Sequence, residues 1–377
     1  MSGSREARTF AAADTASFLG TFGLVFVAIA ALLAVNTVLA NMERAENRAE
    51  ARYFFQEGVR LAEQGRRLEA VDRFRTAMSS ERTNPLYQRA LAAALLAAGK
   101  VADAEAVIAD RLQRDPADAA ASRIMAQALV RQGKWRPAVS YYHRAIHGNW
   151  DQDSVANRVA ARFELVDLLA RQDSKQELLA ELLPLQHGVP ADVATRRRIA
   201  RLFIAAGSPS RAIEIFRAIL RKDRSDADAY AGLGEAELER GNFRTARANF
   251  QAASRLAPNA PEIAAALALG DQVLSLDPTQ RGLASEEQYR RSLALLELTW
   301  QAVQSCAPAS TQGPLQATVD SARTTASQRA SAASRRLSVE RNLDLAERLW
   351  QLRRTECPRP IGESERPMEL VLERVAQ

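Results

Sequence analysis

Small and large apolar residues return at fixed positions along this chain, with a constant period that equals the interval from Gly65 to Gly99. The period holds in two runs. Between them the phase slips, because the interval from Gly133 to Asp173 is six residues longer than one period. The period predicts about six copies of one structural unit, in which glycine closes a tight turn between two helices. The glycines that mark it are Gly65, Gly99, Gly133, Gly207 and Gly241.

Two further positions recur with the same period as the turn residue. Five residues after it the chain prefers alanine, and four residues later it carries a large apolar side chain. The small residue lets the two helices of a unit approach closely, and the large one fills the groove between neighbouring units. A single hairpin buries only part of its apolar surface, so the units must stack. The two sets are Ala70, Ala104, Ala138, Leu178, Ala212 and Ala246, then Phe74, Ile108, Tyr142, Leu182, Phe216 and Phe250.

With these residues the chain resembles the tetratricopeptide repeat family, whose unit is a pair of antiparallel helices with the same period. The resemblance covers roughly residues 51–278 and implies an all-α solenoid of about six units that mediates protein–protein interaction. In the fourth copy, at about 159–189, Asp173 and Leu178 depart from the family's pattern, so we expect a bend or irregular packing there. The best copy, 227–260, carries Tyr230, Leu233, Gly234, Gly241, Ala246, Phe250, Ala253 and Pro258 at the family's spacing.

The repeats end in a predicted capping helix that begins near Pro261 and closes a solenoid domain at residues 51–278. Residues 279–377 form a predicted C-terminal helical region, with amphipathic patterns at 285–305 and 338–354. Between these two patterns, residues 309–336 are rich in Ala, Ser, Thr, Gln and Arg. They fit either a weakly packed helix or a mobile linker.

The N-terminal region contains an uncharged stretch that sets it apart from the repeats. Residues 15–42 carry no charged side chain and include the sequence FLGTFGLVFVAIAALLAVNTVLA. A bilayer-spanning helix needs about 20 apolar residues, so we predict a transmembrane helix at 15–42 in contact with lipid, a tail at 1–14 and a linker at 43–50. The alternative is a cleaved signal peptide, for which Val38-Leu39-Ala40 would be the cleavage site.

The two cysteines bear on the side of the membrane. Cys306 ends the helical pattern WQAVQSCAP and Cys357 ends the similar pattern WQLRRTECP, and two such ends meet if the helices are parallel. A disulfide between them indicates an oxidising compartment and a periplasmic body, whereas two buried free thiols remain the alternative. The positive-inside count slightly favours a cytoplasmic body. We expect a single-pass membrane protein with a periplasmic body.

Composition and charge add little chemistry. The net charge is +6, but 51 basic and 45 acidic residues are interleaved at helical spacing, which favours solvated helix faces over a polyanion-binding surface. We expect no nucleic-acid partner. His143 and His147 lie one helical turn apart without a third candidate metal ligand, and no phosphate loop or catalytic motif is present. The sequence therefore predicts no cofactor, no metal and no enzymatic activity.

The family resemblance implies that partners bind the concave face, which the first helix of each unit lines. At those positions the middle copies are basic, whereas the last copy carries Asp228, Glu235 and Glu239. We hypothesise a groove for an acidic protein segment, in a structural or assembly subunit of a membrane complex; an unoccupied solvent face, a polyanion binder and an enzyme-associated domain with catalysis in 279–377 are the alternatives. The predicted groove residues are Phe55, Arg89, Arg123, Gln127, Arg131, Phe163, Arg197 and Arg201.

Overall fold

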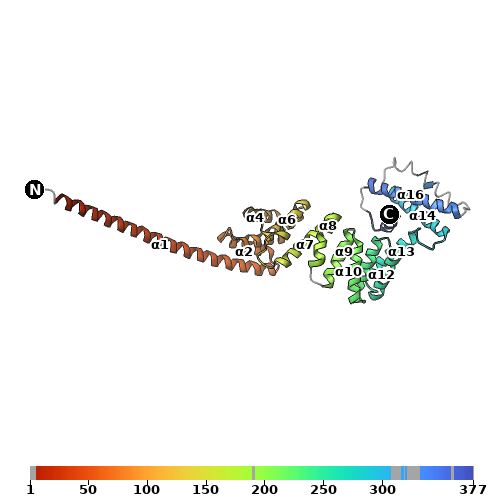
Figure 1. Cartoon of the computed structure of the whole chain (residues 1–377), viewed down its shortest axis with the longest axis horizontal. Helices are drawn as coiled ribbons and strands as arrows, with labels where there is room; N and C mark the ends of the chain where they lie inside the picture. The colour runs from red at the N-terminus through yellow and green to blue at the C-terminus, as the bar shows by residue number, and fades with distance from the viewer. Residues whose placement is uncertain are drawn as a thin grey trace. The chain divides into compact units, whose positions relative to one another are not determined.

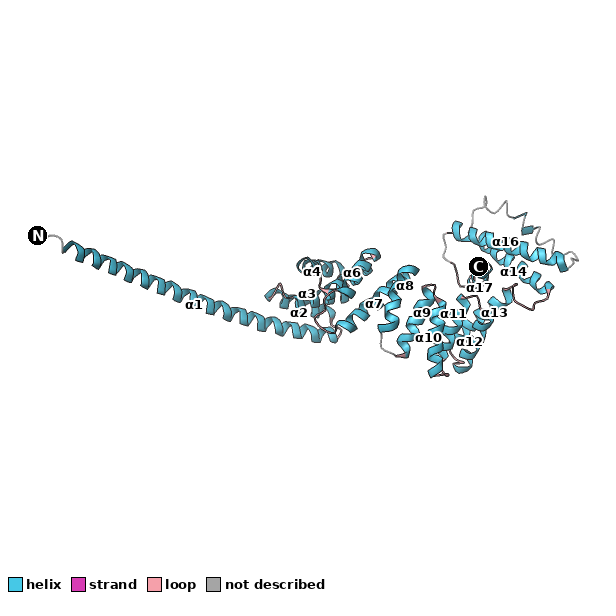
Figure 2. Ribbon diagram, in the orientation of Figure 1, coloured by secondary structure: helices cyan, strands magenta, loops and turns pink. Residues whose placement is uncertain are grey.

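The computed structural model describes residues 6–188, 192–306, 316–317, 319–320, 332–357 and 361–376, with the backbone alone at 6–28, 187–188 and 332–334. Sixteen helices with defined bounds lie in these ranges, together with an isolated β-bridge between Asp118 and Asn149. Figure 2 shows the helices and the loops that connect them. The described part of the chain is therefore an all-α fold, as the sequence predicts. It divides into two compact units, residues 1–165 and 166–377, each described by itself below.

The first unit is built from helical hairpins (Figure 1). The helices pair in sequence order, α1 with α2, α3 with α4 and α5 with α6, and α2 also contacts α3 and α4 contacts α5. Buried apolar residues of α1 to α5 pack together in one cluster, and Ala51, Ala77 and Tyr87 form a second, smaller one. The helices are α1 (Glu6–Glu63), α2 (Arg67–Ser80), α3 (Pro85–Ala97), α4 (Val101–Arg114), α5 (Ala119–Arg131), α6 (Trp135–His147) and the first part of α7 (Ser154–Arg171).

The second unit continues the same pattern and ends in a larger apolar cluster. The hairpin helices are α8 (Lys175–Gly188), α9 (Val193–Ala205), α10 (Pro209–Lys222), α11 (Ala227–Glu239), α12 (Phe243–Leu256) and α13 (Pro261–Leu276). They are followed by α14 (Ser285–Gln304), α16 (Ala332–Glu356) and α17 (Arg366–Val375). Trp300 of α14 and Trp350 of α16 lie in the core of the cluster, and Val371 of α17 packs there too. Residues 309–336, for which the sequence fits either a weakly packed helix or a mobile linker, lie mostly outside the described residues.

The turn residues have the backbone conformation that the period predicts. Gly65, Gly99 and Gly133 have φ of 75°, 79° and 74°, in the left-handed region that glycine enters without a Cβ penalty. Asp173 has φ 51°, and aspartate is one of the few other residues that tolerate this region. The fourth copy therefore keeps the turn without its glycine.

The first helix of the fourth copy is longer than those of the second, third, fifth and sixth copies. Helix α7 has 18 residues, whereas α3, α5, α9 and α11 have 13 each. The six-residue phase slip is thus largely absorbed as extra helix at the start of α7. Pro184 lies inside α8, a second departure from the regular unit, because proline lacks the N–H that an interior helical position donates.

Residues 43–50, the predicted linker, are helical. Helix α1 runs without a break from Glu6 to Glu63, so one helix holds the predicted anchor, the predicted linker and the first helix of the first repeat. Among the residues that the structure describes, no helix has the length and apolar character needed to cross a bilayer. Side chains 15–28, the first part of the predicted span, lie outside those residues. The predicted domain bounds at 51, 278 and 279 stay predictions.

Cys306 and Cys357 form a disulfide in the second unit. Cys306 follows the last turn of α14, Cys357 follows the last turn of α16, and their Cα atoms lie 5.4 Å apart. The two helices pack against each other, so their C-terminal ends meet at the bridge. Of the two alternatives that the sequence left open, the structure has the paired cysteines.

Candidate functional site: the inner helices of the repeats

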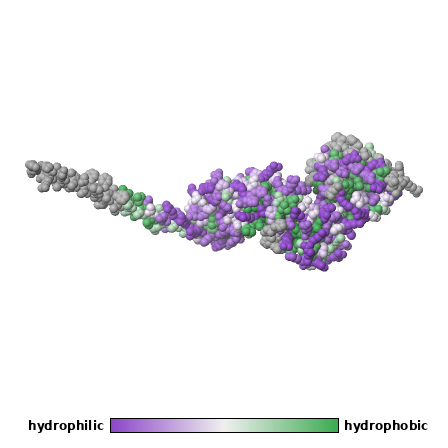
Figure 3. Space-filling view, viewed as in Figure 1, coloured by the Kyte–Doolittle hydropathy of each residue, from purple (hydrophilic) through white to green (hydrophobic). Residues whose placement is uncertain are grey.

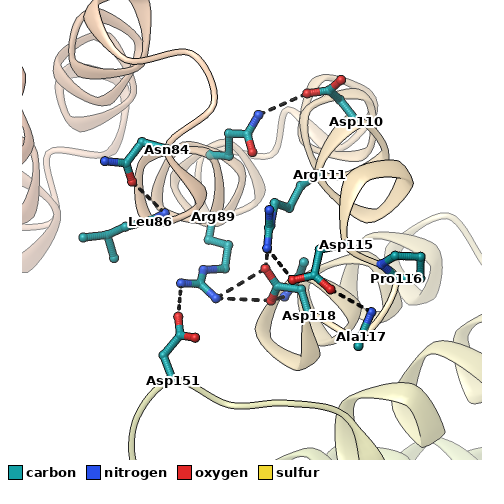
Figure 4. Close-up of polar contacts among 12 residues, drawn as sticks. Asn84, Leu86, Arg89, Asp110, Arg111, Asp115, Pro116, Ala117, Asp118 and Asp151 are labelled. Atoms are coloured by element: carbon teal, nitrogen blue, oxygen red, sulfur yellow. Dashed lines mark hydrogen bonds and ion pairs between the residues drawn. The ribbon is translucent and has the colours of Figure 1, made fainter.

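Arg89, the first arginine predicted to line the groove, is held by carboxylates of its own chain. Its guanidinium contacts both oxygens of Asp118, at 3.2 and 3.3 Å, and also binds Asp151 (Figure 4). The Arg89 side chain is only 13% exposed. It therefore joins the second and third hairpins of the first unit instead of facing a partner.

Asp118 is the centre of this network, which the repeat pattern does not indicate. Its carboxylate caps α5 by accepting a hydrogen bond from the Ala121 N–H at 2.9 Å, and it also binds Nε of Arg111 at 2.7 Å. Its side chain is 1% exposed. Burial acts to raise the pKa of Asp118, but the Ala121 N–H and the two guanidiniums outweigh it, so that the pKa lies below its ordinary value.

Arg123 and Gln127 also have partners within the first unit. Both donate to Glu164 of α7, Arg123 through Nε at 3.0 Å and Gln127 to the two oxygens at 3.1 and 3.0 Å. Arg131 donates to the backbone carbonyl of Leu96 on α3. The structure thus brings Arg123 and Gln127 together, but around an internal carboxylate.

The two phenylalanines predicted as apolar anchors are half-buried. The Phe55 ring lies 5.6 Å from the Phe74 ring and 5.1 Å from the Tyr87 ring, between centroids. It therefore packs in the first repeat and is not an open anchor. Phe163, on α7 of the first unit, is half-buried as well.

In the second unit, Arg197 and Arg201 line one open pocket of about 480 Å³. Arg197 binds Asp226 at 3.5 Å and also binds Asp228. Arg201 is 50% exposed, and its nearest carboxylate, Glu235, is 3.8 Å away. The residues that line the pocket are Asp167, Ala194, Arg197, Arg198, Arg201, Leu202 and Asp228.

Glu235 lies at the acidic end of the same inner face. Burial raises the pKa of its carboxyl, Arg201 opposes this, and the carboxylates of Asp228 and Glu239 raise it further, so that the pKa lies above its ordinary value. Glu239 in turn binds Arg366 of α17. The C-terminal helix therefore contacts the inner face of the last full repeat.

One sequence signal would have revealed the internal pairing. Asp118 and Asp226 each cap an inner helix, and each follows the arginine that binds it, Arg89 or Arg197, at the same interval along the chain. The spacing joins the second turn of one inner helix to the N-cap residue of the next. The predicted row of free guanidiniums is thus largely neutralised. Among the predicted arginines on described residues, Arg201 has only an ion pair with Glu235 at 3.8 Å and no hydrogen bond.

Metal chemistry finds no support in this geometry. His143 is half-buried and His147 is exposed, both on α6. Within the described ranges, no group of three or more His, Cys, Asp and Glu side chains is arranged to hold a metal ion.

Comparison with known proteins supports the repeat pattern. The family model described as tetratricopeptide repeat matches residues 190–270, which contain α9 to α12 and most of α13. A search of curated proteins gives no match to the sequence.

Solved structures of similar fold share little sequence with this chain. YrrB, described as a TPR protein with an unusual peptide-binding site, is 17% identical, with coverage of 51% of this chain and 95% of that chain and a TM-score of 0.42. The type IV pilus biogenesis factor PilW is 16% identical over 58% and 98%, with a TM-score of 0.44. The C-terminal part of a TPR protein from Cytophaga hutchinsonii is 12% identical over 64% and 94%, with a TM-score of 0.47. These likenesses are no evidence about partners.

Proposed function

We propose that the chain, whose residues 190–270 match the tetratricopeptide repeat family, is a non-catalytic scaffold that binds a protein segment at the pocket of α9 and α11. The proposal rests on the exposure and hydrogen bonding of the Arg201 side chain. Within the described residues its guanidinium makes no hydrogen bond, and half of its side chain is exposed at the pocket. A guanidinium in this state has donors available for a carboxylate of a partner.

The pocket also sets the kind of segment that fits. Ala194 and Leu202 supply apolar surface beside Arg201, while Arg197 and Arg198 are occupied by Asp228 and Asp167. One carboxylate next to an apolar side chain matches this lining better than a run of acidic residues, because the other guanidiniums would have to leave their internal partners. The proposed partner is therefore an extended or helical segment with a single acidic residue at this point.

We further propose that α1 holds the scaffold on a membrane, as a structural or assembly subunit of a membrane complex. Residues 15–42 carry no charge. On the described part of this stretch, large apolar side chains are exposed, with Ile29 at 51%, Leu32 at 70% and Met42 at 58% (Figure 3). Apolar surface of this kind is stabilised by contact with lipid. The disulfide supports a periplasmic position of the body, since such bonds persist in oxidising compartments.

A crosslinking experiment tests the binding proposal. A photo-crosslinking residue at exposed Ala194, in the pocket, is compared with one at exposed Arg255 on α12, in full-length chain captured from solubilised membranes. A protein partner should crosslink at position 194 only, and Arg201→Glu should reduce its capture about tenfold, as expected for loss of a charge-assisted contact of about 1.4 kcal/mol. Arg255→Glu is the matched control. Equal capture by wild type and Arg201→Glu would contradict the proposal.

A further inference from the structure

Helix α1 joins two parts of the chain that the sequence separates. Ala51, the first fully buried residue of the repeats, lies on the same unbroken helix as the apolar stretch that ends at Met42. The intervening residues 43–50, ERAENRAE, are exposed and contain no glycine or proline. Glu, Arg and Ala are good helix formers, and a helix extended at both ends does not have to nucleate here. The first repeat therefore has no hinge toward the apolar stretch.

The hairpin geometry then determines which edge of the first unit lies on the side of Met42. Helix α2 runs back along α1, and Nε of Arg48 lies 3.4 Å from a carboxylate oxygen of Glu81. The loop 81–84 at the end of α2 is thus beside residue 48. The turns that contain Gly65 and Gly99 lie at the opposite ends of the hairpins.

Two further loops belong to the same edge as loop 81–84. Asp118 of loop 115–118 forms the β-bridge with Asn149 of loop 148–153. Arg89, on the first turns of α3 after loop 81–84, binds both Asp118 and Asp151 (Figure 4). This network joins the three loops, which we call the proximal edge. The turns at Gly65, Gly99 and Gly133 form the distal edge.

The distance along α1 from the end of the apolar stretch to loop 81–84 is short. Arg48 lies six residues beyond Met42, which corresponds to about 9 Å of helix. The polar layer on each side of a bilayer is roughly 5–8 Å thick. Loop 81–84 would therefore lie at or next to the lipid headgroups if α1 is inserted up to Met42.

We propose that the proximal edge faces the bilayer and the distal edge faces away, in an orientation set by the unbroken helix α1. This inference rests on the bilayer attachment proposed above. Charge does not explain such an orientation, because the three loops hold five acidic residues (Glu81, Asp115, Asp118, Asp151 and Asp153) and one basic residue, Arg82. Glu81 binds Arg48, Asp118 binds Arg89 and Arg111, and Asp151 binds Arg89. The edge thus presents no excess of positive charge to anionic headgroups.

The test uses full-length chain in vesicles of zwitterionic phosphatidylcholine that contain a headgroup-linked quencher. A fluorophore is attached to Thr83→Cys on the proximal edge or to Lys100→Cys on the distal edge, both at exposed positions. The native cysteines are paired and do not react without reductant. Quenching should be several-fold stronger at position 83 than at position 100. It should persist at about 1 M salt, where the Debye length is about 3 Å.

Two replacements of residues 43–50 test the role of the helix. An eight-residue Gly/Ser segment should abolish the difference between positions 83 and 100, while a helix-forming Glu/Ala/Lys segment of equal length should preserve it. A chain that does not float with vesicles overturns the bilayer attachment and this inference with it. A chain that floats but is quenched equally at both positions, loses the difference at high salt, or keeps it with the Gly/Ser segment overturns this inference alone.

Discussion

The guanidinium of Arg89 binds the carboxylate of Asp118, which belongs to the next repeat and caps its inner helix. Arg197 and Asp226 repeat this relationship in the second unit. The contact joins two repeats through the residue that begins a helix. The side chains therefore serve the stacking of repeats, and the inner face is less basic than its sequence indicates.

Replacing Asp118 should destabilise the first unit strongly. Asp118→Ala removes the cap of α5 and leaves Arg89 and Arg111 without a carboxylate that is almost fully buried. We expect a loss of roughly 3 kcal/mol in the free energy of unfolding, measured by urea denaturation followed by circular dichroism.

Asp192→Ala is the matched control for this loss. Asp192 caps α9 by accepting from the Thr195 N–H at 2.8 Å, but its side chain is exposed. Loss of a cap alone costs about 1 kcal/mol. Equal losses for the two variants would show that the arginine contacts of Asp118 contribute nothing.

Glu235 should make stability depend on pH in the opposite direction to a paired carboxylate. Its pKa in the folded chain is raised above the ordinary value of 4.5 by burial and by Asp228 and Glu239. A raised pKa means that the protonated form is favoured in the folded state, so ionisation destabilises it above the folded pKa. Glu235→Gln should therefore raise the melting temperature at pH 7.

The gain should disappear as the pH falls below the ordinary value of 4.5, because Glu235 is then protonated in the folded and the unfolded chain. Glu214→Gln, at an exposed position of α10, is the control. Thermal unfolding followed by circular dichroism across this range measures both variants. A melting temperature lowered at pH 7 by Glu235→Gln would mean that the Arg201 contact outweighs the neighbouring carboxylates.

Local regularities were readable from the sequence because they act within one hairpin. The constant period located the hairpins, and the left-handed turn at Asp173 follows from its place in that period. The helix at 43–50 was missed although its composition favours helix. ERAENRAE contains no glycine or proline, and the helix continues through it from the apolar stretch into the first repeat.

The state of the groove residues depends on neighbours that only stacking supplies. Arg123 meets Glu164, 41 residues away on the next inner helix. Phe55 meets Tyr87 from the next hairpin. Contacts between successive hairpins depend on how the hairpins rotate as they stack, which the residue period does not specify. For that reason the sequence indicated a basic groove where the chain forms internal ion pairs.

Loss of the disulfide should loosen the C-terminal cluster. The bond joins residues separated by 51 positions, and closure of a loop of that length contributes up to about 4 kcal/mol through the unfolded state. Cys306→Ser with Cys357→Ser should lower the unfolding midpoint detected by tryptophan fluorescence, since Trp300 and Trp350 are buried in this cluster. Reductant should lower the midpoint of the wild type and leave that of the double variant unchanged. A reductant effect on the double variant would point to another cause.

Phe250 provides a last test, because two glycines contact it at different distances. A Cβ at Gly234 of α11 would lie 2.5 Å from Cε1 of Phe250, whereas a Cβ at Gly270 of α13 would lie 3.3 Å from Cδ2. Since Phe250 is fully buried and cannot move aside, Gly234→Ala should cost about 1–3 kcal/mol by overpacking. Gly270→Ala needs only a small shift and gains up to about 1 kcal/mol in helix propensity, so it should be close to neutral. Urea denaturation compares the two variants, and a neutral Gly234→Ala would mean that α11 and α12 are further apart than the structure places them.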